Sequence, residues 1–410
     1  MSRLTDLIIV GGGAAGLACA VTAARRGLNV LILERLDRVG KKLLATGNGR
    51  CNLMNVSSPR YPGGGAFADQ VLRQCGVEEQ KAFWAALGLT LREEDGGRVY
   101  PSSGQASTVL DSLRLALTLH HVQVETGVHV TAVEQTKHGF IVESQERQYR
   151  ARYVLIAGGG KAQPKLGSDG SAMELLRALG HRIHPCKPAL TQIQTDTKPI
   201  AGLTGIRVKA DVSVMQGEKK LYQERGEVLF ADYGVSGVCM MQCARYAQQK
   251  GATLAINFLH GMGFADADAA FSELERRRCE WKALPMEQLL TGLCVPRLSS
   301  SLCKAAGIVW KDRVISSLKQ NEIRVLVQEM QHFTLRVQGV KGFEQAQVTS
   351  GGADPTQFDS TTMESRLVPG LYAAGEVLDV DGDCGGYNLM FAFACGLIAG
   401  NHMEVTRDNY

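Results

Sequence analysis

The chain has 410 residues, 45% hydrophobic and 21% charged, which is typical of a soluble globular protein. This length exceeds the ~250–300 residues at which single cores stop growing, so we expect more than one domain. The net charge of +4, from 45 basic and 41 acidic residues, argues against a nucleic-acid-binding protein. No apolar segment reaches the roughly 18 residues that span a bilayer. Eleven scattered cysteines, and a first apolar stretch too short for a secretory signal, favour a cytoplasmic protein with reduced thiols.

An apolar strand, a glycine-rich turn and a helix are the first predicted elements. The strand over 6–10 leads into the G-x-G-x-x-G turn of 11–16, and an Ala-rich helix follows as far as Arg25. In such a turn the glycines allow a tight bend, close approach of a pyrophosphate and close packing of helix on strand, while the helix N-terminus attracts phosphate. The residues predicted to bind a dinucleotide here are Gly11, Gly13, Ala14, Ala15 and Gly16.

A second predicted strand, over 29–33, ends in an acidic residue. Glu34 lies about 20 residues beyond the turn, where a carboxylate accepts hydrogen bonds from the ribose hydroxyls of an adenine dinucleotide. The same charge would repel a 2′-phosphate. We therefore predict that Glu34 and its neighbour Arg35 bind the cofactor.

The chain beyond Glu34 alternates between loops, helices and short strands. Gly, Asn and Thr are dense over 38–52 and indicate a loop. Helices are predicted over 66–91, 107–120 and 167–179, and strands over 98–101, 122–125, 128–133, 140–144 and 149–156. The last of these strands runs into a second run of glycines at 158–160. The residues of this part that we predict to contact the cofactor are Val130, Ala157, Gly158 and Gly159.

A change of pattern begins near Pro188. Strands predicted over 205–215, 227–230 and 253–258 mix with helices over 265–278, 286–290 and 296–305, and the segment 234–237 is predicted to begin a further helix. A strand then enters the glycine turn at Gly375, and an Ala-rich helix runs from Asn388 to Gly400.

Glycine-rich strand ends occur at three distant places, 11–16, 157–160 and 375–386. Ligands of open α/β sheets bind outside the carboxyl ends of the strands. FAD is long enough to contact all three places, whereas a nicotinamide dinucleotide needs only the first, so FAD is predicted as the resident cofactor. No second complete G-x-G-x-x-G is present, so any NAD(P)H contact is expected to be transient.

One open sheet must use the glycine motifs at both ends of the chain. We therefore predict an α/β fold, a Rossmann-like FAD-binding domain of the glutathione-reductase type, formed by 1–187 and 349–410. An α+β domain with antiparallel strands, over 188–348, is predicted to be inserted between the two parts and to contribute to the substrate site.

Several motifs together resemble those of one family. They are Gly47-Asn48-Gly49-Arg50-Cys51-Asn52, Gly167-Ser168-Asp169-Gly170, Pro188-Ala189-Leu190, Gly234-Val235-Ser236-Gly237, and Ala374 to Gly382 with Gly385-Gly386-Tyr387-Asn388. In order and spacing they look like a family of bacterial FAD flavoproteins that includes aminoacetone oxidase and a bile-acid dehydro-Δ4,6-reductase. The resemblance covers essentially the whole chain and implies a flavoprotein with an inserted domain.

The first of these motifs departs slightly from the family pattern. The family usually has Ser-Gly-Gly-Gly-Arg-Cys-Asn, where this chain has Thr46 and Asn48. Asparagine tolerates the left-handed backbone better than most residues, so we expect the loop to keep its shape.

The loop over 46–52 offers backbone N–H groups, an amide and a guanidinium. Arg50 binds the cofactor pyrophosphate, holds a substrate carboxylate or carbonyl, or makes a structural salt bridge. Lys41 and Lys42 follow the same reasoning more weakly, with one of the two expected to be solvated, and Cys51 is expected to be a buried packing residue. The predicted cofactor-binding residues of this region are Lys42, Thr46, Gly47, Asn48, Gly49, Arg50, Cys51 and Asn52.

The last motif is expected to lie beside the flavin. Asp379 is predicted to accept hydrogen bonds from ribityl hydroxyls, and the helix beginning at Asn388 is predicted to aim its N–H groups at the pyrimidine edge. A plain helix cap is the alternative for Asn388. The aspartates of 379–383 lack the later Glu of a calcium loop, and no histidine spacing indicates a metal. The predicted cofactor-binding residues are Gly375, Glu376, Asp379, Gly385, Gly386, Tyr387 and Asn388.

These features predict an FAD-dependent oxidoreductase that transfers a hydride between flavin and a small organic substrate, with NAD(P)H-fed reduction of a conjugated double bond preferred. An amine oxidase that produces hydrogen peroxide is the first alternative, and a flavin-bound nucleic-acid-modifying or scaffold protein is the second. Arg50 and Tyr387 are the predicted catalytic residues. We expect a small-molecule substrate, and neither a nucleic acid nor a membrane as partner; the sequence leaves the oligomeric state open.

Overall fold

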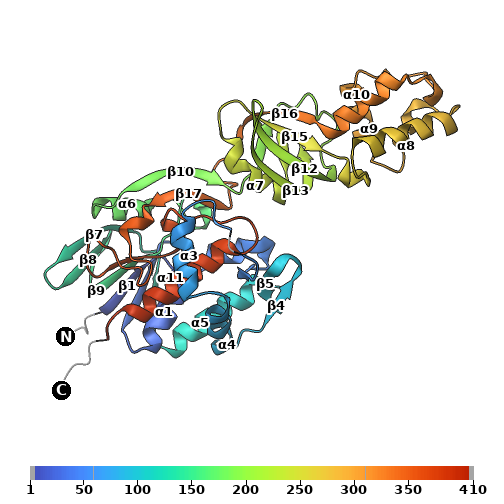
Figure 1. The fold of residues 1–410 in the computed structure, drawn as a ribbon. Coiled ribbons are helices and arrows are strands. Elements are labelled where there is room, and N and C mark those ends of the chain that lie inside the picture. Colours follow the sequence, from blue (N-terminus) through green and yellow to red (C-terminus); the bar gives the residue numbers. More distant parts are fainter. Residues whose placement is uncertain (1–4, 59, 310, 406–410) are drawn as a thin grey trace. The chain divides into compact units, whose positions relative to one another are not determined.

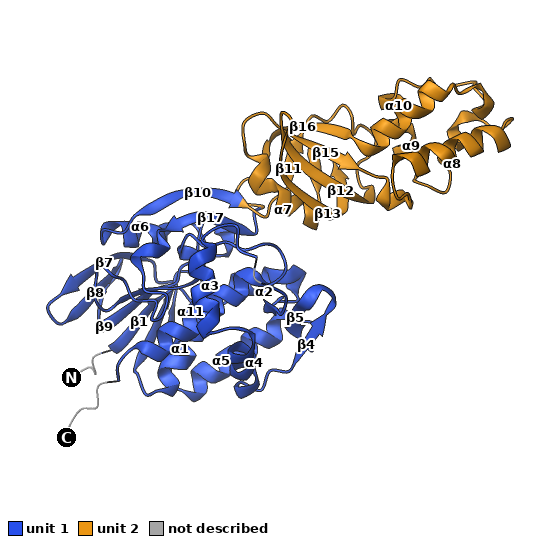
Figure 2. Ribbon diagram, viewed as in Figure 1, with its two compact units in different colours: residues 1–188, 346–410 blue, residues 189–345 orange. Residues whose placement is uncertain are grey.

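The computed structural model describes residues 5–58, 60–309 and 311–405 (Figure 1). The chain divides into two compact units (Figure 2). Unit 1 comprises residues 1–188 and 346–410, and unit 2 comprises residues 189–345.

A mixed seven-stranded sheet is the centre of unit 1. Its main path follows the order β6-β2-β1-β9-β8-β7, and β18 pairs with β9. The strands β1, β2, β6, β9 and β18 pair with one another in parallel, whereas β8 pairs antiparallel with both β7 and β9. The strand bounds are β1 (Thr5–Val10), β2 (Val30–Glu34), β6 (Gln123–Thr126), β7 (Val130–Thr136), β8 (Gly139–Ser144), β9 (Gln148–Ile156) and β18 (Leu371–Ala373).

The parallel strands are apolar runs because layers of structure cover both of their faces. All five residues of β2 are buried, as are the last four of β1. Helices α1 (Ala14–Arg25) and α11 (Tyr387–His402) lie side by side in Figure 1. Their backbones approach closely, since a Cβ at Gly396 would lie 2.2 Å from the carbonyl oxygen of Ala15.

Shorter elements complete unit 1. Its other helices are α2 (Lys41–Ala45), α3 (Gly65–Gln74), α4 (Val77–Ala86), α5 (Ala106–Leu119) and α6 (Ser171–Ala178). A three-stranded sheet has the order β3-β5-β4, with β3 (Met54–Asn55), β4 (Leu91–Glu94) and β5 (Arg98–Pro101). The strands β10 (Ile183–Ala189) and β17 (Val348–Ala353) form a separate pair.

Unit 2 is built on a closed six-stranded barrel with the order β11-β14-β13-β12-β15-β16. Alternate residues of β12 point inward, so that Ala210, Val212 and Val214 are buried in a core of the unit's own. The strand bounds are β11 (Ile193–Thr195), β12 (Arg207–Gln216), β13 (Lys219–Ala231), β14 (Gly234–Ser236), β15 (Ala252–Asn257) and β16 (Phe333–Val340). The helices are α7 (Val238–Ala247), α8 (Ala267–Glu280), α9 (Pro296–Ala305) and α10 (Gln320–Gln331).

The predicted fold class is confirmed, but several predicted elements are wrong in detail. The helix predicted over 66–91 is two helices, because the chain turns at Gly76, whose N–H is bonded by the Glu79 carboxylate at 2.9 Å. The segment 234–237 is strand β14 followed by the N-cap of α7, where the φ of +107° at Gly237 is incompatible with a helix interior. The helix predicted over 286–290 is only a short 3₁₀ turn.

Within the described ranges, none of the helices combines the length and apolar character that a bilayer crossing requires.

Candidate functional site

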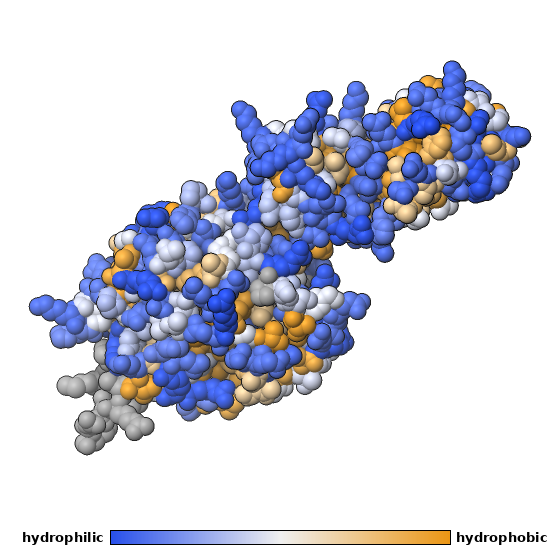
Figure 3. All heavy atoms as spheres, in the orientation of Figure 1, coloured by the Kyte–Doolittle hydropathy of each residue, from blue (hydrophilic) through white to orange (hydrophobic). Residues whose placement is uncertain are grey.

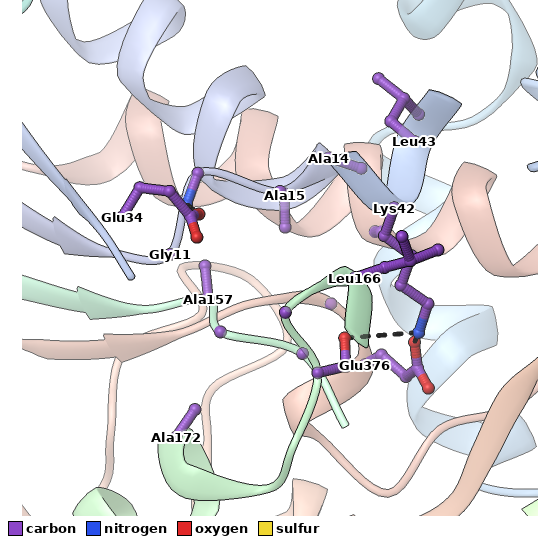
Figure 4. A pocket seen from close by; sticks show the side chains of 18 of the residues that line it. Gly11, Ala14, Ala15, Glu34, Lys42, Leu43, Ala157, Leu166, Ala172 and Glu376 are labelled. Atoms are coloured by element: carbon purple, nitrogen blue, oxygen red, sulfur yellow. Dashed lines mark hydrogen bonds and ion pairs between the residues drawn. The ribbon is translucent and has the colours of Figure 1, made fainter. Parts of the chain in front are cut away.

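A deep pocket opens in unit 1 at the carboxyl ends of β1, β2, β9 and β18, with an empty volume of about 1290 Å³ including its mouth (Figure 4). These strands run parallel, so the residues that follow them come together at one edge of the sheet. Figure 4 shows Glu34 at one end of the view and Lys42 with Glu376 at the other, with Ala15 and Ala14 between them. The pocket is therefore elongated along the N-terminus of α1.

The glycine turn that forms the pocket floor tolerates no side chain at two of its positions. Gly11 has a φ of +105°, and a Cβ there would lie 2.7 Å from the carbonyl oxygen of Ala157. A Cβ at Gly16 would lie 2.1 Å from the carbonyl oxygen of Gly11. The first turn of α1 carries no acidic residue of its own, and its residues Ala14 and Ala15 line the pocket.

Glu34 is held rigidly at the end of β2. Its side chain accepts hydrogen bonds from the N–H of Gly12 and from the N–H of Leu36, both at 2.8 Å. The residue is only 9% exposed, yet it lines the pocket. A carboxylate oxygen has more than one lone pair, so Glu34 retains acceptor capacity for ligand hydroxyls.

An ion pair marks the other end of the pocket. The Nζ atom of Lys42 lies 2.6 Å from an oxygen of Glu376, and the second oxygen of Glu376 accepts from the N–H of Thr349 at 2.8 Å. Both charged side chains are about one-fifth exposed. The pair joins α2, which carries Lys42, to the turn after β18, which carries Glu376. Gly40, which precedes α2, donates its N–H to the carbonyl of Gly12 and so connects α2 to the glycine turn as well.

The segment 166–175 forms a wall that residue-by-residue prediction missed. Arg35 binds it through Asp169 at 2.6 Å and through the carbonyl oxygen of Gly167 at 3.2 Å. In the sequence, this wall was indicated by the family motif at 167–170, but no residue of that motif was predicted to contact the cofactor. The pocket residues that were not predicted include Gly12, Arg38, Lys41, Val128, His129, Leu166, Ser168, Ser171, Ala172, Gln347, Val348, Leu389, Phe391 and Ala392.

Asn388 clamps the turn that precedes α11. Its side-chain oxygen accepts from the N–H of Gly382 at 2.8 Å, and its side-chain nitrogen donates to the carbonyl of Gly382 at 2.9 Å. The N-cap residue itself is Gly386, with a φ of +106°, and the helix begins at Tyr387. The predicted start at Asn388 was one residue late, and the side chain fixes the loop rather than capping the helix.

The structure brings together one part of the predicted cofactor-binding set and leaves another part outside the pocket. Those that line the pocket are Gly11, Gly13, Ala14, Ala15, Glu34, Arg35, Lys42, Thr46, Val130, Ala157, Gly158, Gly159, Gly375, Glu376 and Asn388. Those outside its lining are Gly16, Gly47, Asn48, Gly49, Arg50, Cys51, Asn52, Asp379, Gly385, Gly386 and Tyr387.

Arg50 is paired within unit 1. Its guanidinium lies 2.5 Å from an oxygen of Glu94 and 4.1 Å from the centre of the Tyr100 ring. Arg92 binds the same oxygen of Glu94 at 2.7 Å. Of the three roles that the sequence allowed for Arg50, these contacts favour the structural salt bridge. The catalytic role of Arg50 stays a prediction.

The rest of the loop keeps the backbone shape that the sequence suggested. Asn48 has a φ of +55° and lies in the left-handed region, as expected for the residue that replaces a family glycine. Burial raises the pKa of the Cys51 thiol to about 12, so this side chain is a neutral packing residue at physiological pH.

Tyr387 and Asp379 contact protein groups near the pocket. The backbone oxygen of Tyr387 accepts from the hydroxyl of Tyr61 at 2.7 Å, and burial raises the pKa of the Tyr387 phenol. The carboxylate of Asp379 accepts from the N–H of Gly351 at 2.8 Å and contacts Nδ1 of His184 at 2.7 Å. The ribityl contact predicted for Asp379 therefore competes with two protein partners and stays a prediction.

The residues present fit FAD. A buried carboxylate lies where a ribose is expected, and a glycine turn with a helix N-terminus lies where a pyrophosphate is expected. Lys42 lines the pocket as one half of an ion pair with Glu376. The pocket continues past Gly375 to the N-terminus of α11, which gives room for more than a mononucleotide.

The fold and the pocket together define an FAD-dependent oxidoreductase. Residues 5–402 match the family model described as the HI0933-like protein Rossmann domain, and the chain belongs to this family.

Several curated relatives span nearly the whole chain. The 3-dehydro-bile acid delta(4,6)-reductase of Clostridium scindens is 37% identical over 402 residues, which are 96% of this chain and 97% of that protein. The ribosomal RNA dihydrouridine synthase of Haemophilus influenzae is 28% identical over 413 residues, 97% of this chain and 99% of that protein.

Among solved structures, a 3-ketosteroid-Δ4-(5α)-dehydrogenase from Rhodococcus jostii RHA1 matches with a TM-score of 0.47 and 16% identity, over 97% of each chain.

Proposed function

We propose that this protein reduces a carbon–carbon double bond conjugated with a carbonyl group in a small organic molecule, with NAD(P)H as the electron donor. The observation that supports this most directly is the end-to-end 37% identity with a bile-acid reductase. The FAD-shaped pocket of unit 1 supplies the physical basis, because flavin carries hydride chemistry when bound.

The names of both curated relatives describe one kind of chemistry. A 3-dehydro bile acid with delta(4,6) double bonds is a ketone conjugated with carbon–carbon double bonds. Dihydrouridine is uridine whose ring double bond, conjugated with a carbonyl, has taken up two hydrogens. In each case the carbon remote from the carbonyl receives a hydride equivalent and the adjacent carbon receives a proton.

The residues of the chain take separate roles in this proposal. Glu34 and the glycine turn hold the adenine-ribose and pyrophosphate parts of FAD, and the Lys42–Glu376 pair lies beside the remainder. Tyr387 is the proposed proton donor, because it is the first residue of α11, two glycines precede it, and the residues that follow it line the pocket.

Anaerobic mixing tests the electron donor and the acceptor separately. We expect NADH or NADPH to bleach the flavin absorbance, and a steroid 4,6-dien-3-one to restore it with uptake of two electrons per double bond. The variant Tyr387→Phe should slow the restoration while its flavin content stays that of the wild type. Bleaching by an amine, with hydrogen peroxide formed in air and no reaction with NAD(P)H, would instead establish an amine oxidase.

A second candidate is reduction of uridine in ribosomal RNA. It is favoured by the 28% identity with two ribosomal RNA dihydrouridine synthases over at least 95% of this chain. Deleting the gene and measuring dihydrouridine in ribosomal RNA by mass spectrometry distinguishes the two substrates. An unchanged dihydrouridine content, together with turnover of the dienone, supports the small-molecule reductase and the expectation that no nucleic acid is a partner.

A further inference from the structure

The segment 281–319 of unit 2 carries the whole charge excess of the chain. It contains six basic and two acidic residues, whereas the remaining residues contain equal numbers of each. The acidic residues of the segment are Glu287 and Asp312. The guanidinium of Arg313 forms an ion pair with the carboxylate of Glu322 at 2.9 Å. Lys282, Lys311 and Lys319 are all exposed.

The same segment is rich in exposed aliphatic side chains. Among the described residues, ten large hydrophobic side chains are exposed, and four of them belong to 281–319. Val309 is the most exposed of the ten, at 70%, and Leu284 and Val314 are 43% and 41% exposed. Figure 3 shows hydrophobic and hydrophilic residues side by side at the end of unit 2 that carries α8, α9 and α10.

The backbone holds these side chains in one neighbourhood. Leu284 accepts from the N–H of Ile315 at 2.9 Å, so the strand-like segment 284–286 runs beside 313–315. The carbonyl of Val309 accepts from the Arg313 guanidinium at 3.2 Å. Leu284, Val309 and Val314 are thereby placed close to the lysines that flank them in the sequence.

We propose that this surface, formed by Lys282, Leu284, Val309, Lys311, Val314 and Lys319, docks the protein on an anionic lipid membrane. Lysines beside exposed aliphatic residues fit such a surface, because the cations lie at the phosphate level and the aliphatic groups enter the acyl boundary. An RNA backbone would be matched by the lysines alone and gives the aliphatic residues no role. The proposal replaces the expectation that no membrane is a partner, which followed from the lack of a bilayer-spanning segment and does not address docking on a membrane surface. It concerns a second surface and does not depend on the reaction at the flavin pocket.

Co-sedimentation with vesicles tests the proposal on the full-length holoprotein. We expect binding to vesicles of phosphatidylglycerol and phosphatidylcholine, and at least tenfold weaker binding to phosphatidylcholine alone or in 0.5 M salt. Leu284→Asn/Val309→Asn/Val314→Asn and Lys282→Glu/Lys311→Glu/Lys319→Glu should each weaken binding at least tenfold, with flavin content and melting temperature kept.

The matched control is Lys209→Glu/Lys219→Glu/Lys220→Glu, which changes the net charge equally at exposed positions of β12 and β13 in the same unit. It should bind vesicles like the wild type. Equal loss in this control would overturn the proposal, since binding would then follow net charge. Unchanged binding of the asparagine variant, or binding to an RNA duplex without binding to vesicles, would overturn it as well.

Discussion

Two regions of unit 1 were both marked by glycines in the sequence, but they differ in what the glycines do. At the edge of the large sheet, Gly11 brings the backbone against Ala157 and leaves an open pocket above it. In the region of 47–52 and 385–387, the glycines let protein pack against protein. A Cβ at Gly386 would lie 2.6 Å from the carbonyl oxygen of Met54, and Asn55 donates to the carbonyl of Gly385 at 2.9 Å.

The difference shows which kind of motif predicts a ligand contact. The G-x-G-x-x-G turn has a backbone mechanism, so spacing and strand order are enough to place it at a pocket. A polar loop such as 46–52 is defined by side chains, and the partners of a side chain depend on the tertiary structure. Arg50 donates to Glu94, which is 44 residues away in the sequence, and no local pattern indicates this pairing.

Gly11→Ala, in the first of these two regions, is expected to have the largest effect on stability and on flavin binding. The added Cβ would meet two backbone atoms at 2.7 Å at a position with a φ of +105°, so neither neighbour can move aside cheaply. We expect a loss of roughly 3–5 kcal/mol in the free energy of unfolding and protein that purifies without flavin. Denaturant unfolding and the flavin absorbance of the purified protein measure both effects.

Gly65→Ala is the matched control for this substitution. Gly65 is the first residue of α3, and a Cβ there would have no atom within 4 Å. It should retain flavin and gain slightly in stability, because alanine favours helix. Equal flavin content in both variants would show that the turn does not contact the cofactor.

Substitutions of Glu34 test whether its carboxylate stabilises the free protein as well as binding the ligand. Glu34→Ala leaves the N–H groups of Gly12 and Leu36 without their acceptor, which costs roughly 2–4 kcal/mol. Glu34→Gln keeps one acceptor oxygen and should lose less. Because the loss occurs in the free protein, saturating FAD should not restore the melting temperature fully. Complete rescue by FAD would assign Glu34 to the ligand alone.

The Lys42–Glu376 pair tests the far end of the pocket. Both side chains are partly exposed, so solvent screens the pair and we expect Lys42→Met to weaken FAD binding by about 1–2 kcal/mol. Glu376→Gln also disturbs the bond to Thr349, and the double variant should show coupling of about 1 kcal/mol. Fluorescence titration with FAD gives the four affinities; additive effects would mean that the two residues act independently.

Sequence reasoning reached the fold class and the glycine-built part of the pocket, because both follow from local patterns. The strand β1 and the last residues of β9 are apolar runs that lead into glycine turns, and α9 was predicted at its observed bounds. The closed barrel was not foreseen, because β11 and β14 have only three residues each and are held by pairing with distant strands. The wall formed by 166–175 was missed for the same reason, since Arg35 meets Asp169 only in the folded chain.

The smallest expected effect belongs to Arg50→Ala, which probes the second region. The side chain is partly exposed, pairs with Glu94 and lies over Tyr100, so solvent screens the pair and its removal should lower the stability only slightly. Flavin content should match the wild type, because Arg50 does not line the pocket.

The stability difference between the wild type and Arg50→Ala should also depend on pH. The hydrogen bond from Arg50, followed by that from Arg92, lowers the pKa of Glu94 below its ordinary value of 4.5. A group whose pKa is lowered by folding stabilises the protein above its unfolded pKa, and this contribution is lost as the pH falls through the folded pKa. The stability difference between wild type and Arg50→Ala should therefore be constant from neutral pH to about 5 and shrink below about 4. Unfolding curves at several pH values measure it. A loss of flavin in this variant at neutral pH would instead show that Arg50 contributes to binding the cofactor.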